Sequence, residues 1–304
     1  MTSFPAARTP AGSHAVAGVV AMLIGTGLFS LNDALGKWLL TTYSVGELLL
    51  IRGVASMILI APFMWRAGPT AFTQSPRPLL QIVRLFFSTL EVAMFFWAVS
   101  YLPLADTVTF YLAAPIYVTA LSVVVLGEKV GGRRWTAVAI GFAGVMLAMR
   151  PSQASLTLPA LIALVGSMFF ACLMIVTRLL RETSNTVLVS GQIMATLLFG
   201  ILTAPFAWVT PSPRDLALLS LFGVVSIVAL ACVNYSLKLA AASVVVPYQY
   251  TIIVWAIMLG YLVFGNLPDA FTLAGATIIV AAGLYIFWRE QRQREREPDS
   301  PLHP

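Results

Sequence analysis

Charged side chains interrupt several long apolar stretches of this sequence. Asp33 and Lys37 lie one helical turn apart in the stretch FSLNDALGKWLL, and Arg52 lies in the next apolar stretch. Arg84 and Glu91 are seven residues apart in a third stretch, a spacing that places both on one face of a helix. A charged side chain at the centre of a bilayer costs about 2.5–3.5 kcal/mol on insertion scales. Such residues are therefore candidates for ion pairing, substrate contact, gating or proton binding.

The direction of each stretch through a membrane sets the expected depth of these charges. With the first stretch running outward, Asp33 and Lys37 lie toward its outer end, and Arg52 lies at a depth similar to that of Asp33. For Asp33 and Arg52 two interpretations remain open, a structural ion pair and a gate or substrate contact. For Lys37, Glu47 and Asp106 we expect an interfacial position near water with no further role.

Glu91 is expected near the middle of the membrane, with Arg84 closer to the cytoplasmic side. The assigned spans place no basic residue at the depth of Glu91. A lone carboxyl group at that depth is either protonated or faces a wet cavity. We predict that Glu91 faces a cavity and exchanges protons there.

Neutral polar and aromatic residues replace charges in the second half of the chain. Pro115 and Pro247 each remove one helical hydrogen bond and loosen a turn, and freed carbonyl groups beside Tyr and Gln suit a ligand with aromatic or amide groups. The alternative is that these residues only hold helices together. The candidate contacts are Tyr111 in the first half and Asn234, Tyr235, Tyr248, Gln249, Tyr250 and Trp255 in the second.

The composition predicts an integral membrane protein. Of the 304 residues, 59% are hydrophobic and only 10% are charged, whereas soluble domains contain about 25% charged residues. The apolar stretches are continuous rather than alternating, which favours helices over a barrel. Ten helical spans are expected, at residues 15–36, 45–65, 79–101, 106–126, 134–149, 158–179, 186–208, 215–237, 243–264 and 269–288.

The distribution of Lys and Arg predicts the orientation of these spans. With a cytoplasmic N-terminus, thirteen of the 18 basic residues lie on the cytoplasmic side and three outside. Cytoplasmic loops carry an excess of basic residues, so both termini are expected in the cytoplasm. The location that we expect is the inner membrane of a bacterium. The basic residues lie in loops and tails, so nucleic-acid binding is not expected.

The two halves of the chain share a pattern. Residues 110–149 and 246–287 each contain a proline near the start of a span, a Gly-polar corner and a final span with spaced glycines. The corners are Gly127-Glu128 and Gly265-Asn266. Five spans per half is an odd number, so the second half must be inverted. Inverted repeats are typical of transporters that work by alternating access.

The segments TFYLAAPIYVTALSVVVLGEKVGG and PYQYTIIVWAIMLGYLVFGN carry a resemblance to a known family. Over residues 15–289 the sequence resembles the EamA family of the drug/metabolite transporter superfamily. NDALGKWL and PYQYTIIVWA look most like the branch with S-adenosylmethionine and riboflavin uptake carriers. The second half departs from the family pattern at Asn266, where the family often has glutamate. The resemblance implies a ten-helix bundle with a central cavity that carries small metabolites.

These observations predict an all-α integral membrane protein with ten transmembrane helices in a 5+5 inverted repeat. The repeats are expected at 15–149 and 158–288, with a linker at 150–157 and cytoplasmic segments at 1–14 and 289–304. We expect a secondary transporter of a small polar or aromatic metabolite, acting as a monomer or a homodimer in the lipid bilayer, with Asp33 in an outer gate and protons coupled at Glu91.

The alternatives are a membrane-embedded enzyme and a structural membrane protein without transport activity. The sequence contains no GxxxxGK[ST], HExxH or GxSxG motif, which argues against ATP hydrolysis and against an enzyme. Both histidines lie outside the spans, and the two cysteines lie in apolar stretches. Neither a metal site nor a cofactor is expected.

Overall fold

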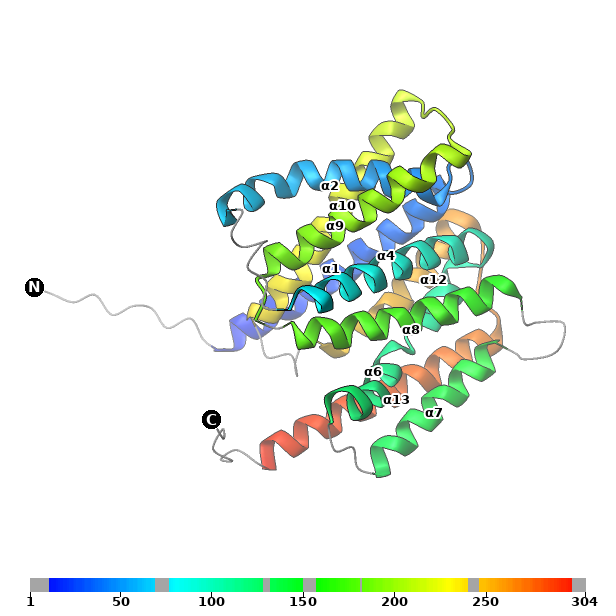
Figure 1. Ribbon diagram of the computed structural model, residues 1–304. Helices are drawn as coiled ribbons and strands as arrows, with labels where there is room; N and C mark the ends of the chain where they lie inside the picture. Colours follow the sequence, from blue (N-terminus) through cyan, green and yellow to red (C-terminus); the bar gives the residue numbers. More distant parts are fainter. Residues whose placement is uncertain are drawn as a thin grey trace, which may run out of the picture.

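The computed structural model of the chain describes residues 11–68, 77–127, 132–149, 157–180, 182–239 and 246–296 (Figure 1). All regular structure within these ranges is helical. The first ten residues of the expected N-terminal segment, the expected linker from 150 to 156 and the tail after residue 296 lie outside the described residues.

The helices follow one another with short connections. Their bounds are α1 (Ala11–Leu39), α2 (Val45–Ala67), α4 (Pro78–Tyr101), α5 (Leu104–Tyr111), α6 (Ala114–Leu126), α7 (Gly132–Met149), α8 (Leu158–Leu179), α9 (Asn185–Thr203), η1 (Ala204–Ala207), α10 (Pro213–Leu239), η2 (Val246–Thr251), α12 (Ile252–Phe264) and α13 (Ala270–Arg296).

Seven helical segments of the described residues are long and apolar enough to cross a membrane. Shorter apolar helices lie at Trp135–Ala148, Tyr248–Phe264 and Ala270–Tyr285. The prediction of an all-helical membrane protein is confirmed.

Capping and turn residues explain where several helices begin and end. The backbone N–H of Glu47 donates to Ser44 Oγ at 3.2 Å at the beginning of α2, and Val187 donates in the same way to Ser184 at the beginning of α9. The corner glycines Gly127 and Gly265 both have φ near 67°, a conformation that glycine adopts without a steric penalty.

Two helices are interrupted near the prolines that the sequence singles out. α5 ends at Tyr111 and α6 begins at Ala114, so the helix breaks directly before Pro115. Pro247 lies in the 3₁₀ helix η2, which leads into α12. Both prolines thus lie at changes of helical geometry, where a missing backbone N–H is tolerated.

The two halves of the chain interleave. α1 packs along α10, α2 along α9, α4 along α8, and α7 along α13 (Figure 1). α12 lies against α1 and α5, and α6 lies against α8. Each of these contacts joins a helix before residue 150 to one after residue 157, so the main hydrophobic core forms between the halves.

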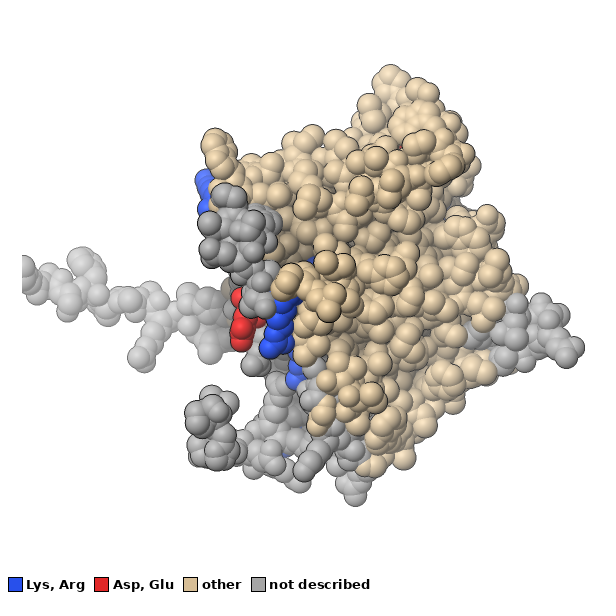
Figure 2. Space-filling model, viewed as in Figure 1, with Lys and Arg blue, Asp and Glu red and all other residues tan. Residues whose placement is uncertain are grey.

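The outer surface suits lipid along most of the bundle. Large apolar side chains such as Ile58, Phe63 and Leu262 are 60–69% exposed. Figure 2 shows an almost uncharged face, with its Lys, Arg, Asp and Glu residues gathered at one end. α1 begins and α13 ends at that same end (Figure 1).

Candidate functional site

Asp33 on α1, Arg52 on α2 and Glu91 on α4 meet inside the bundle. The guanidinium group of Arg52 interacts electrostatically with both carboxyl groups, and the two carboxyl groups interact with each other. All three side chains remain partly accessible. Within the described part of the chain, no hydrogen bond or ion pair joins them directly. We refer to these three residues as the central charge cluster.

The cluster corrects one expectation from the sequence. The prediction that no basic residue lies at the depth of Glu91 is wrong, because Arg52 acts on it electrostatically. Counting residues along upright helices misses the reach of a long arginine side chain, whose charged end can lie far from its backbone. Asp33 also belongs to this cluster, so the expected outer gate and the expected proton-coupling residue lie together.

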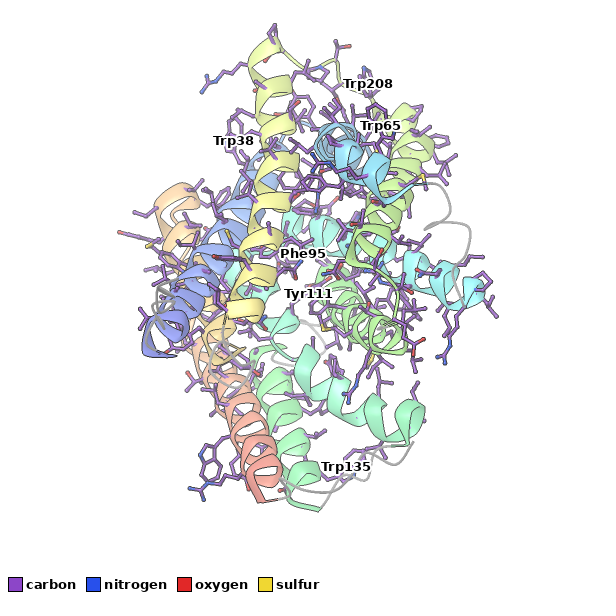
Figure 3. All side chains as sticks on the ribbon, turned by 90° about the vertical axis from the view of Figure 1, so that its left-hand side faces the viewer. Trp38, Trp65, Phe95, Tyr111, Trp135 and Trp208 are labelled. Atoms are coloured by element: carbon purple, nitrogen blue, oxygen red, sulfur yellow. The ribbon has the colours of Figure 1, made fainter. Side chains whose placement is uncertain are left out.

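Aromatic side chains continue from the cluster into the core. The Tyr111 hydroxyl donates to the backbone carbonyl of Glu91 at 3.2 Å. The Arg52 guanidinium lies 5.1 Å from the centroid of the Phe222 ring, within the range of cation–π attraction. Tyr111 and Phe95 lie near the centre of the bundle in Figure 3, whereas Trp135 lies at its periphery. Neighbouring ring centroids are 5.0, 5.1 and 5.3 Å apart along the series Tyr111, Phe95, Phe96, Phe222.

A polar face of α1 leads through the cluster. Thr26, Ser30, Asp33 and Lys37 are spaced so that they share one side of the helix. The hydroxyl groups of Thr26 and Thr251 are 3.2 Å apart, which joins this face to the end of η2. The Ser30 hydroxyl is fully buried and has no hydrogen-bond partner among the described residues. The i, i+4, i+7, i+11 spacing was visible in the sequence and could have revealed this face.

Lys37 stabilises the end of α4. Its Nζ donates to the backbone carbonyls of Val99 and Leu102, at 2.7 and 2.5 Å. It also lies 5.4 Å from the Phe264 ring and interacts electrostatically with Asp106. The last carbonyl groups of a helix lack hydrogen-bond donors within the helix, and here the ammonium group of Lys37 donates to two of them. Lys37 therefore has a structural role that the expected interfacial position did not include.

Glu47 is covered by neighbouring side chains in the first turn of α2, a packing that the expected interfacial position did not include. Its Oε2 accepts the backbone N–H of Val209 at 3.2 Å, which ties the beginning of α2 to the loop after η1. Nearby, the Tyr43 hydroxyl donates to Asp215 at 2.7 Å. This hydrogen bond raises the pKa of Tyr43 above its ordinary value. Both contacts became visible only in the tertiary structure, because they join residues more than 150 positions apart.

Arg84 is held at a different position from the central charge cluster. Its side chain is 6% exposed and donates to Thr177 Oγ1 and to the Leu188 carbonyl, both at 2.9 Å. These contacts join α4 to the end of α8 and the beginning of α9. Arg84 shares a helix with Glu91, as expected, but its described partners are neutral.

The candidates in the second half are spread over the bundle. Tyr235 and Tyr248 are 58% and 38% exposed, and Gln249 is also exposed. Tyr250 packs against Gly283 of α13. Among the described residues, no hydrogen bond or ring contact joins these four side chains to the central charge cluster. Their proposed contact with substrate stays a prediction.

Asn234 and Trp255 are half-buried. Trp255 lies beside Gly27 of α1, where an added Cβ atom would be 3.5 Å from the indole ring, and it borders an apolar groove between α1 and α12. Its indole Nε1 is buried without a partner among the described residues. The groove has an apolar lining, so it lacks the groups that would orient a polar ligand.

Comparison with known proteins assigns the family. A model described as the EamA-like transporter family matches residues 16–150 and again residues 157–288. The chain belongs to this family. It is therefore a multi-pass membrane transporter and not an enzyme, as the sequence predicted.

Curated relatives cover nearly the whole EamA-like chain. An S-adenosylmethionine uptake transporter of Rickettsia prowazekii is 25% identical over 93% of this chain and 96% of the relative. A riboflavin transporter of Rhizobium johnstonii is 27% identical over 94% and 95%. A pseudopaline exporter of Pseudomonas aeruginosa is 27% identical over 87% and 94%. The predicted resemblance to the S-adenosylmethionine and riboflavin carrier branch is confirmed.

A solved crystal structure has the same fold as this chain. It covers 93% of the chain, and the chain covers 99% of it, with a TM-score of 0.57 and 15% sequence identity. This likeness concerns the fold alone.

Proposed function

We propose that this transporter is a secondary carrier of a small polar or aromatic metabolite, with its substrate and coupling site at the central charge cluster. The observation that carries the proposal is a set of three charges that meet inside the bundle, remain partly accessible and are not paired directly. Unpaired charges at membrane depth are expensive and mark pathways for substrates or ions. The named substrates of the relatives are small metabolites, which supports the substrate class.

The packing pattern supports ten spans in two inverted repeats, at 15–149 and 158–288. Exchanging the halves maps the α1–α10 contact onto α4–α8, and the α1–α12 contact onto α6–α8. The α2–α9, α7–α13 and α5–α12 contacts map onto themselves. This is the pattern that a pseudo-twofold axis between inverted halves would produce.

Two hydrogen bonds support the same symmetry. Tyr43, between α1 and α2, bonds to Asp215 in the first turn of α10. Thr183, between α8 and α9, accepts from Gln81 in the first turn of α4 at 3.3 Å. In each case the turn between the first two helices of one half docks on the third helix of the other half. The charged end that holds the beginning of α1 and the end of α13 supports a cytoplasmic location for both termini.

Alternating access would expose the cluster to one side of the membrane at a time. Glu91 is the proposed proton-coupling residue, since a carboxyl group that gains or loses a proton changes the charge of the site during the cycle. Protons supply the driving force in this scheme. The chain is proposed to act as a monomer or a homodimer.

Transport by purified protein in proteoliposomes tests the proposal. Labelled riboflavin, S-adenosylmethionine and amino acids are the first probes, with a pH gradient in each direction. We expect flux of at least one probe that the gradient accelerates, and loss of this acceleration in Glu91→Gln. Glu47→Gln is the matched control, because it neutralises a buried carboxyl group outside the cluster. Absence of flux for every probe under both gradients would refute the carrier function.

A further inference from the structure

The central charge cluster has one more acidic than basic group. Asp33 and Glu91 supply two carboxyl groups, and Arg52 supplies the single guanidinium. Lys37 does not cancel this excess, because it does not act electrostatically on Asp33 or Glu91 and interacts with the carboxylate of Asp106 instead. With both carboxyl groups ionised, the described residues of the site therefore carry one net negative charge.

The other elements packed on α4 add no compensating charge near Glu91. The titratable groups that act on Glu91 are Arg52 and Asp33, and Tyr111 lies beside it. α8 and α9 also pack on α4, and their sequences include only Cys172 and the cytoplasmic-end residue Arg178 as titratable side chains. Neither residue acts electrostatically on Glu91.

The second half replaces the charges of the first with neutral groups. Ser44 and Ser184 cap α2 and α9 in the same way, which aligns the two helices. The eighth residue after the cap is Arg52 in α2 and Gln192 in α9. In α10, Ser226 takes the place that Glu91 has in α4, thirteen residues after the first proline of the helix. The excess negative charge of the cluster is thus not balanced by its symmetry-related positions.

Aromatic rings beside the cluster suit a cation. The guanidinium group of Arg52 already lies over the ring of Phe222, and Tyr111 and Phe95 continue the aromatic lining. Ring faces attract cations, most strongly where water is excluded. A negative excess beside such rings favours a positively charged group over a neutral group of the same shape.

We propose that the central charge cluster recognises an ammonium or sulfonium group of its substrate, and that this group competes with one proton shared by Asp33 and Glu91. The inference rests on the proposed function, because it names the substrate class of the same site. Binding of the cation releases one proton from a carboxyl group to water, and its departure allows that carboxyl group to take up a proton again. The site is then neutral in both states, and cation and proton move in opposite directions.

Matched probes that differ in charge test this inference. S-adenosylmethionine and S-adenosylhomocysteine differ by one methyl group and by the positive charge of the sulfonium. S-methylmethionine and methionine form a second pair with the same difference. Binding to the purified full chain is measured by isothermal titration calorimetry in buffers of different ionisation enthalpy, which counts the protons released.

We expect the sulfonium member of at least one pair to bind about tenfold more tightly or better, a factor that corresponds to about 1.4 kcal/mol. About one proton should be released per cation bound, and the affinity should fall as the pH is lowered. Glu91→Gln and Asp33→Asn should each reduce the preference for the cation and abolish proton release. Glu47→Gln should retain both, and size-exclusion profiles verify that the variants are folded.

Equal or tighter binding of the neutral members, or binding of cations without proton release, would overturn the inference. Binding of no member of either pair would overturn it as well. Flux of a neutral metabolite in the proteoliposome assay would leave the carrier function intact in each of these cases. The two proposals can therefore fail separately.

Discussion

Gly36 is predicted to set the distance between α1 and the aromatic core. A Cβ atom at this position would lie 2.5 Å from Phe96 Cε1 and 3.0 Å from Phe222 Cε2. Both rings are buried, at 3% and 0% exposure, so neither can move away without disturbing its neighbours. Overpacking of this kind costs about 1–3 kcal/mol. Alanine recovers about 0.8–1 kcal/mol of helix propensity relative to glycine, so Gly36→Ala should lower the free energy of unfolding by up to roughly 2 kcal/mol.

Gly260→Ala is the matched control for this substitution. Gly260 lies within a helix like Gly36, but a Cβ there would meet only the Asn266 carbonyl oxygen at 3.6 Å. This variant should be neutral or slightly stabilised. A difference of about 2 kcal/mol between the variants corresponds to about 4–8 °C in melting temperature for a chain of about 150–250 residues, and to a somewhat smaller shift for this chain of 304 residues. Thermal melting of the purified protein in detergent, followed by intrinsic fluorescence or static light scattering, measures this difference.

A second substitution separates packing from other causes. Phe96→Leu removes the ring atoms that the new methyl group would meet, so Gly36→Ala should cost less in the Phe96→Leu background. Equal melting temperatures for Gly36→Ala and Gly260→Ala would refute the close contact between α1 and the two rings. Strict additivity of Gly36→Ala and Phe96→Leu would refute the assignment of the cost to Phe96.

Two further substitutions test contacts near the end of α1 and the beginning of α2. Lys37→Met should lower the melting temperature, because the loss of the ammonium group leaves the Val99 and Leu102 carbonyls unsatisfied at a cost of about 1–3 kcal/mol. Lys37→Arg should retain most of the stability. An unchanged melting temperature for Lys37→Met would contradict the structural role of Lys37 at the end of α4. Tyr43→Phe should melt below the wild type at neutral pH, because it removes the hydrogen bond to Asp215. The pKa of Tyr43 is raised in the folded state above its ordinary value of 10.0. The difference in melting temperature between Tyr43→Phe and the wild type should therefore persist at pH values below 10.0 and disappear as the pH rises through the folded-state pKa. A difference in melting temperature that grows at alkaline pH would contradict this.

The sequence predicted much of the secondary structure because membrane helices can be recognised from the length and hydrophobicity of their sequences. The apolar stretches expected at 45–65 and 158–179 correspond closely to α2 and α8. Proline and glycine marked the places where the chain changes direction, as at Gly265 and before Pro115. Motifs in the same stretches were sufficient to identify the family.

The sequence predicted the polar residues of the candidate site less completely. Asp33, Arg52 and Glu91 were singled out because charge in an apolar stretch is costly, but their assembly into one cluster was not foreseen. The positions of Phe96 and Phe222 beside the cluster could not be predicted from the sequence, since aromatic residues are common in any apolar helix. Glu47 and Arg84 were placed by depth alone, and depth does not reveal which neutral backbone or hydroxyl groups lie opposite.

The sequence by itself thus determined the membrane location, the helical segments and the family, because these properties depend on local composition and motifs. The tertiary structure alone decided which side of each helix faces the interior and which helices become neighbours. A helix that is apolar on nearly all sides has no hydrophobic stripe that fixes its rotation. The contacts of Arg52 with Glu91 and of Lys37 with Val99 join separate helices of the first half, and the contact of Tyr43 with Asp215 joins the two halves. All three arise only when the helices pack together.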